Sequence, residues 1–127
     1  MNVLIDSCGW IEYFGKGPKI NEYASFIDNA NPKNYYTPSI VLYEVYKKIK
    51  KELSDEKAME ACAYIVSYTS IVSLDEKVAF AAADLSSEYG LPMADAVIMA
   101  TAIMYEATIV TSDKHFEKLD DVRFIGA

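Results

Sequence analysis

Short apolar segments alternate with helical patterns along almost the whole chain. The first segment, residues 2–5, reads NVLI, and a helix is expected to begin directly after it at Asp6-Ser7. Further strands are expected at residues 35–38, 71–74, 108–111 and 122–125. Strands separated by helices form βαβ units, in which parallel strands carry helices on both faces. The sequence therefore predicts an α/β fold of three layers, α/β/α, around a central, mostly parallel sheet of four to five strands.

The intervening segments have the spacing and end signals of helices. Helices are expected at residues 7–14, 19–30, 39–53, 55–67, 75–89, 93–106 and 113–119. The chain has 127 residues, which suits one domain with a real core and is too short for two of ordinary size. We therefore expect a single domain over residues 1–127.

Composition removes several classes of protein and of active site. No apolar run reaches the roughly 18 residues needed to span a bilayer, and the N-terminus lacks the pattern of a signal peptide, so we expect a cytoplasmic protein. The two cysteines, Cys8 and Cys62, have no CxxC spacing. His115 is the only histidine, which excludes a Ser/His/Asp triad and sites with several histidines. Catalysis in such a chain would rest on carboxylates.

Four acidic residues follow predicted strands or lie on the first turns of predicted helices. They are Asp6, Glu44, Asp95 and Asp113. Taken singly, each has an ordinary explanation as a helix cap, an exposed position or a partner of a helix dipole. Taken together, they converge on the edge of the sheet where ligands bind in open α/β folds. Like charges in one cleft repel unless protons or cations intervene, and oxygen ligands suit Mg²⁺ or Mn²⁺.

The charge balance disfavours a polyanionic partner at first sight. Twelve basic and 19 acidic residues give a net charge of −7. A local basic strip follows Glu44 on the same predicted helix, however, and is formed by Lys47, Lys48, Lys50 and Lys51. These lysines are candidates for contacts with the phosphates of a polyanion such as RNA, although a solvated helix face is the more common explanation of such a strip.

Four motifs, taken in order, resemble the PIN domain family, and especially its VapC-type toxin ribonucleases. The most specific is residues 91–102, LPMADAVIMATA, which is similar to the family's leucine-proline pair followed by an aspartate-alanine pair and a helix of small residues. Residues 111–116, TSDKHF, look like the fourth motif of the family. The opening LIDS, which ends in Asp6-Ser7, and TPSIVLYEV around Glu44 complete the order. The resemblance covers nearly the whole chain.

The resemblance implies a PIN-like fold and a metal-dependent endoribonuclease. It implies that Asp6, Asp95 and Asp113 bind Mg²⁺ or Mn²⁺, and that Glu44 acts directly or through a metal-bound water. Thr111 would hold Asp113 or a ligand in place, and Ser7 would support Asp6. In this family a metal-activated water attacks the phosphodiester in line, which gives a 5′-phosphate and a 3′-hydroxyl. One departure is Cys8, which stands where many relatives carry serine or asparagine.

The resemblance also implies partners: an RNA substrate, a small VapB-like antitoxin and a second copy in a homodimer, without a membrane. Aromatic side chains that would suit an antitoxin, if exposed, are Trp10, Tyr13, Tyr43 and Tyr46. At helical spacing the same residues are equally typical of a core.

Three alternatives stay open at this stage. The chain could be a PIN nuclease of RNA processing, or a PIN scaffold that binds RNA or protein without cleaving, although degenerate members usually lose acids and all four are present here. A phosphatase of the haloacid dehalogenase type also begins with a strand and an aspartate. That chemistry needs a second aspartate two residues later, where this chain has Cys8.

Overall fold

The computed structural model describes residues 1–126 and contains five parallel strands within them. They are β1 (Asn2–Ile5), β2 (Tyr36–Pro38), β3 (Ser70–Val72), β4 (Ala107–Thr111) and β5 (Val122–Phe124). Strands β1, β4 and β5 form one sheet in the order β1-β4-β5, and β2 pairs with β3. A single parallel bridge between Val3 and Tyr35 joins the two parts. The predicted parallel sheet is therefore present, but its hydrogen bonds form a three-stranded part and a two-stranded part.

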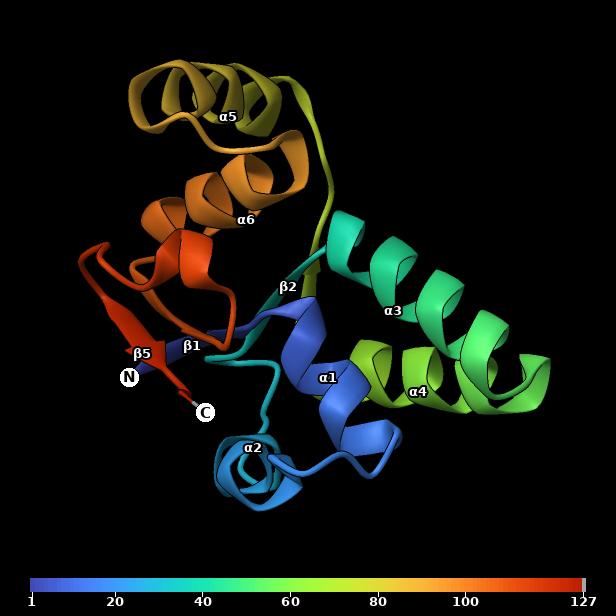
Figure 1. Ribbon diagram of the computed structural model, residues 1–127. Coiled ribbons are helices and arrows are strands. Elements are labelled where there is room, and N and C mark those ends of the chain that lie inside the picture. Colours follow the sequence, from blue (N-terminus) through green and yellow to red (C-terminus); the bar gives the residue numbers. More distant parts are fainter. Residues whose placement is uncertain (127) are drawn as a thin grey trace.

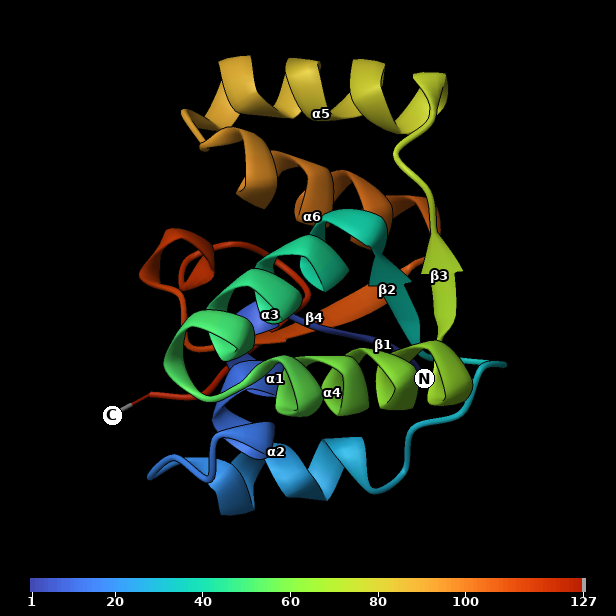
Figure 2. The ribbon, with the colours of Figure 1, turned by 90° about the vertical axis from the view of Figure 1, so that its right-hand side faces the viewer.

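Six α-helices surround these strands in the described part of the chain. They are α1 (Ser7–Phe14), α2 (Ile20–Ile27), α3 (Ser39–Glu52), α4 (Asp55–Tyr68), α5 (Glu76–Tyr89) and α6 (Met93–Met104). Figure 2 shows α5 and α6 on one side of the strands and α1, α2 and α4 on the other, which is the predicted α/β/α layering. Among residues 1–126, no helix is long and apolar enough to cross a lipid bilayer.

Local sequence signals explain where most helices begin and end. The side chains of Asp6, Ser54 and Asp75 accept hydrogen bonds from backbone N–H groups at the starts of α1, α4 and α5. Helix α5 ends at Gly90, whose φ of 68° lies in the left-handed region that glycine adopts without strain.

The predicted helix at residues 113–119 is instead one 3₁₀ turn, η1 (Lys114–Phe116). The chain must turn quickly into β5 after this point, and Asp121 takes a positive φ of 55° just before that strand.

Most of the hydrophobic core lies between the strands and helices α1 to α4. Leu4 and Val110 of the central strands are fully buried there, together with Trp10 of α1 and Val45 of α3. A second, smaller cluster lies between α5 and α6, where Val78 packs with Val97. Helix α6 is therefore covered by the sheet on one side and by α5 on the other (Figure 1), as its nearly all-apolar sequence predicts.

The strand order creates a favoured place for a ligand. From β1 the chain goes to β2 and β3 on one side, and it then returns to β4 and β5 on the other side of β1. The order thus reverses between β1 and β4, and ligands of open α/β sheets bind beyond the carboxyl ends of strands at such a switch point. Asp6 follows β1 directly, and Asp113 lies two residues after Thr111, the last residue of β4.

Candidate metal and catalytic site

Asp6 lies at the bottom of the site and is almost completely buried, with 3% exposure. Its Oδ1 accepts a hydrogen bond of 2.7 Å from the backbone N–H of Ser7, and the Ser7 hydroxyl lies 3.4 Å from the same oxygen. Burial raises the pKa of the Asp6 carboxyl, and the charges of Asp95 and Asp113 add to this effect, whereas hydrogen bonds from Thr111 and Ser7 oppose it. The backbone N–H of Ser7 thus helps to hold the Asp6 carboxyl group in position.

The buried Thr111 hydroxyl connects two of the predicted aspartates. It donates a hydrogen bond of 2.7 Å to Asp6 Oδ2 and accepts one of 2.9 Å from the backbone N–H of Asp113. The Cys8 thiol lies beside this connection, 3.7 Å from Asp6 Oδ2, and accepts a hydrogen bond from the backbone N–H of Ser112. A thiol is a weak donor, so Thr111 is the stronger support of Asp6 on this side.

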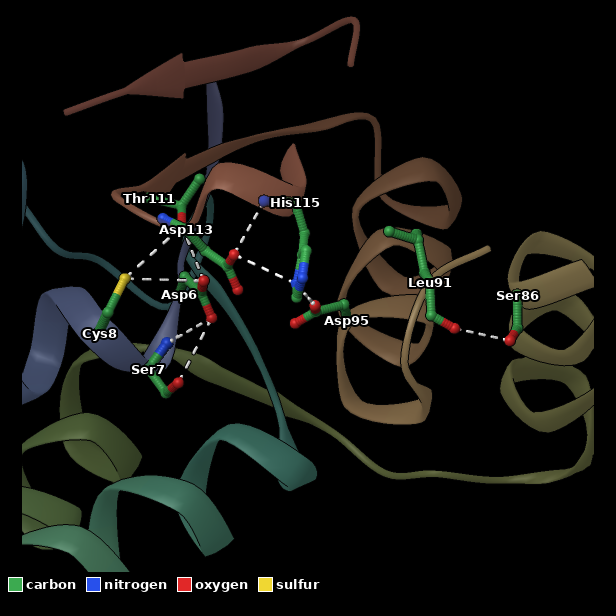
Figure 3. A network of polar contacts seen from close by, with 9 residues as sticks. All are labelled: Asp6, Ser7, Cys8, Ser86, Leu91, Asp95, Thr111, Asp113 and His115. Carbon is green, nitrogen blue, oxygen red and sulfur yellow. Dashed lines mark hydrogen bonds and ion pairs between the residues drawn. The ribbon is translucent and has the colours of Figure 1, made fainter. Parts of the chain in front are cut away.

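Asp95 reaches the site from the first turn of α6. The turn that leads into this helix is fixed by the Ser86 hydroxyl, which donates a hydrogen bond of 2.7 Å to the carbonyl of Leu91 (Figure 3). The Asp95 side chain retains 12% exposure. Burial raises the pKa of the Asp95 carboxyl, a hydrogen bond with His115 lowers it, and the charge of Asp113 raises it further.

His115 was absent from the predicted site, and the structure places its ring between two of the aspartates. Its Nδ1 lies 2.6 Å from Asp95 Oδ2 and 3.3 Å from Asp113 Oδ1 (Figure 3). The hydrogen bond to Asp95 and the charges of both carboxylates raise the pKa of the imidazole. The sequence feature that could have indicated His115 as a site residue is its position two residues after Asp113, on the same turn.

Glu44 joins the site from α3. Its carboxyl is half-buried, and no donor among residues 1–126 reaches its buried Oε1 atom. Burial raises the pKa of Glu44, an interaction with the Ser7 side chain partly offsets this rise, and the charges of Asp6, Asp95 and Asp113 add to it. A buried acceptor without a donor is costly, and a cation or a cation-bound water would satisfy it.

The donor set fits a divalent cation. One ligand atom each from Asp95, Asp113 and His115 lies within 4.8 Å of the others. Asp6 adjoins this group through Thr111 and Asp113, and Glu44 through the charge interactions above. Carboxylates with raised pKa values indicate repulsion and desolvation that a cation would relieve. The carboxylate oxygens of this set suit Mg²⁺ or Mn²⁺.

The lysines that we predicted as RNA contacts are all exposed on α3. Lys47, Lys48 and Lys51 follow Glu44 by three, four and seven residues, so they share its face of the helix. Lys50 lies on another face, with its ammonium 5.4 Å from the centre of the Tyr46 ring. The shared face favours Lys47, Lys48 and Lys51 over Lys50 for the predicted contact with RNA.

The aromatic residues proposed for an antitoxin contact differ in burial, and Tyr13 and Tyr46 are partly buried. Trp10 is completely buried and packs near Phe14 and Tyr64, with ring centres 6.3 Å and 6.2 Å away. The expectation that Trp10 could face a partner is therefore wrong, because its position on α1 points into the core. Tyr43, in contrast, is 58% exposed.

Solved structures show the same fold in other proteins. A toxin–antitoxin complex from Klebsiella pneumoniae has a chain that is 23% identical, with a TM-score of 0.80 over 99% of this chain and 100% of that one. The toxin VapC20 of Mycobacterium tuberculosis, described as cleaving the sarcin–ricin loop, is 13% identical, with a TM-score of 0.80 and coverage of 99% and 98%. VapBC2 of Rickettsia felis, bound to promoter DNA, has a chain that is 20% identical, with a TM-score of 0.73 over 99% of this chain and 98% of that one.

Sequence comparison identifies the family. No curated protein matches the chain in sequence. The family model of the PIN domain matches residues 3–122, a range that includes all four acidic residues, the whole of β2, β3 and β4, and part of β1 and β5. The chain therefore belongs to the PIN domain family.

Proposed function

We propose that this protein is a metal-dependent endoribonuclease that acts as the toxin of a toxin–antitoxin pair. The observation that carries the proposal is the convergence of Asp6, Glu44, Asp95 and Asp113 at the switch point of the sheet, where burial and then the charges of the other three raise the pKa of Glu44. Repulsion within an acid cluster of this kind destabilises the folded state, and a bound catalytic cation would offset that repulsion.

The chain's own residues divide the work. Asp6, Asp95 and Asp113 would hold the cation, which when bound would lower the pKa of water and offset charge on the phosphate. Glu44 has a raised pKa and an Oε1 atom that no donor among residues 1–126 reaches, so it is suited to accept the proton of the attacking water. The hydrogen bonds from Thr111 and from the N–H of Ser7 oppose the rise that burial causes in the pKa of Asp6, and they hold the carboxyl group in place.

The basic strip lies on α3, the same helix that carries Glu44. Lys47, Lys48 and Lys51 share the face of Glu44 and are exposed. Their ammonium groups would bind phosphates next to the scissile bond and would offset the net charge of −7 locally.

The proposed partners rest on the similar structures. Three of them are described as toxin–antitoxin or VapBC complexes, and one as a toxin that cleaves the sarcin–ricin loop. We therefore propose a small VapB-like antitoxin as the protein partner, a homodimer as the working assembly, and an RNA loop as the first substrate to test.

The test is RNA cleavage by purified protein, with the new ends sequenced. The substrates are total RNA and a synthetic sarcin–ricin stem-loop, with Mg²⁺, with Mn²⁺ and with EDTA. We expect cleavage with 5′-phosphate and 3′-hydroxyl ends in the presence of metal. Asp6→Ala and Asp95→Asn should abolish it, and Asp95→Asn should melt no lower than wild type, because it removes a repelling charge.

Full activity of Asp95→Asn in protein free of contaminating nuclease would refute the assignment of the site. Cleavage that continues in EDTA would refute metal dependence.

The neighbouring genes distinguish a toxin from a nuclease of RNA processing. We expect a gene for a short DNA-binding protein next to this one, and the product of that gene should form a stable complex that suppresses cleavage.

A further inference from the structure

A single imidazole enters the carboxylate cluster at its open side. Figure 3 shows the ring of His115 directed at the side chains of Asp95 and Asp113. The Nδ1 atom lies 2.6 Å from Asp95 Oδ2 and 3.3 Å from Asp113 Oδ1. This nitrogen is therefore held where the two carboxylates would meet a shared ion.

These separations match those between neighbouring ligands of one octahedral ion. Ligand atoms about 2.1 Å from such an ion, at right angles to each other, lie roughly 3.0 Å apart. The two measured distances, 2.6 Å and 3.3 Å, lie on either side of that value. A cation bound between these groups would take the place of the hydrogen-bonding proton, and the ligand atoms would shift from these separations to about 3.0 Å apart.

The position of the ring is fixed by its short turn. The backbone N–H of His115 donates a hydrogen bond of 2.9 Å to Asp113 Oδ1, which caps η1, and the next residue, Phe116, is completely buried. The side chain itself is 57% exposed. One side of the imidazole therefore faces the carboxylates, and the other side is open to solvent.

We propose that His115 supplies its Nδ1 atom as a ligand of the cation held by Asp95 and Asp113, so that the site selects Mn²⁺ over Mg²⁺. The inference rests on the proposed function, because it concerns the cation of the same site. The chemistry follows from the donor types. Mg²⁺ prefers oxygen ligands and keeps its water, whereas imidazole nitrogen suits transition ions. Replacing one oxygen ligand by nitrogen thus favours Mn²⁺.

The experiment uses electron paramagnetic resonance of Mn²⁺, a readout that is independent of RNA cleavage. Metal-free full-length protein is titrated with Mn²⁺, and loss of the signal of free Mn²⁺ gives its affinity. Mg²⁺ added as a competitor gives the second affinity. Electron spin echo modulation then reports whether a ¹⁴N nucleus is coordinated to the bound Mn²⁺. The variants are His115→Gln and, as a matched control on the neighbouring exposed residue, Lys114→Gln.

We expect ¹⁴N coupling in wild type and in Lys114→Gln, and its loss in His115→Gln. We also expect His115→Gln to weaken Mn²⁺ binding by about tenfold or more, the lower end of the effect seen when a metal ligand loses its support, and to change Mg²⁺ binding by much less. Bound Mn²⁺ without ¹⁴N coupling in wild type, or an equal change for both ions, would overturn the role of His115.

The proposed function is tested separately in the same series. If Mn²⁺ binds wild type without nitrogen coupling and Asp95→Asn abolishes that binding, the inference about His115 fails and the metal-dependent nuclease stands. If wild type binds neither ion at millimolar concentration, both the inference and the metal-dependent mechanism fail.

Discussion

Replacing Thr111 by valine tests whether its hydroxyl holds together the residues that follow β1 and β4, Asp6 and Asp113. The side chain is fully buried, and its Oγ1 donates to Asp6 Oδ2 at 2.7 Å and accepts from the Asp113 N–H at 2.9 Å. Valine has nearly the same shape and cannot make either bond. The variant therefore removes a polar connection while it preserves the packing.

The expected loss of stability follows from these two bonds. A buried hydrogen bond to a charged group contributes about 1.5–3 kcal/mol, and a buried N–H left without a partner costs about 1–3 kcal/mol. The side chain of Asp113 is 32% exposed, so water partly replaces the second bond. We expect a net loss of roughly 2–4 kcal/mol, which for a chain of this size lowers the melting temperature by about 8–16 °C.

The assay is urea unfolding in EDTA, followed by the fluorescence of Trp10, which is the only tryptophan and is completely buried. The matched control is Thr101→Val. Thr101 is equally buried, and its hydroxyl donates to the carbonyl of Val97 one turn earlier in α6. That carbonyl belongs to a helix ladder, so we expect the control to lose less than about 1 kcal/mol.

The loss in Thr111→Val should also depend on pH. The hydroxyl stabilises the charged form of Asp6 and lowers its pKa against the effect of burial. Its removal is therefore most costly where Asp6 is ionised, and the difference from wild type should shrink as the pH falls. A loss of stability equal to that of Thr101→Val at every pH would refute the idea that Thr111 holds the site together.

Three further predictions concern charge. Without metal, the stability of the wild type should fall as the pH rises from the ordinary carboxyl range, because raised pKa values mean that the folded state binds more protons than the unfolded one. The raised pKa of His115 acts in the same direction and at higher pH, and melting curves in EDTA at several pH values measure both effects. Millimolar Mg²⁺ or Mn²⁺ should raise the melting temperature of wild type but not of Asp95→Asn, and by more at pH 8 than at pH 5; equal behaviour of both proteins would contradict a cation site. Removal of Lys47 and Lys51 should weaken RNA binding and reduce its salt dependence by about 1.4 logarithmic units per decade of salt, whereas Lys50→Ala on the other face should leave both unchanged.

The placement of helices and strands could be predicted because local signals decide it. Asp6, Ser54 and Asp75 mark helix starts by capping, and the apolar pattern of residues 93–104 marks α6 as a central helix. The division of the sheet could not be predicted. Whether β2 pairs with β1 along its length depends on how the helices set the strand positions, and a single bridge at Val3 is the result.

His115 shows the corresponding limit for the site. Its neighbour in space, Asp95, lies 20 residues earlier in the chain, on a different element. A local pattern places Asp113 after a strand, but it does not say which way the next side chains of a 3₁₀ turn point. That direction follows from the burial of Phe116 and from the position of α6, which are both tertiary effects.

The burial of α6 also sets the charge state of the site. Asp95 lies in the first turn of this helix, where the helix dipole favours a negative charge by roughly 0.3–1 kcal/mol. Its pKa is nevertheless raised, with burial as the largest cause, so desolvation outweighs the dipole. An ion bound by Asp95 would recover part of this cost, so the burial that raises the pKa of Asp95 also favours the binding of a cation there.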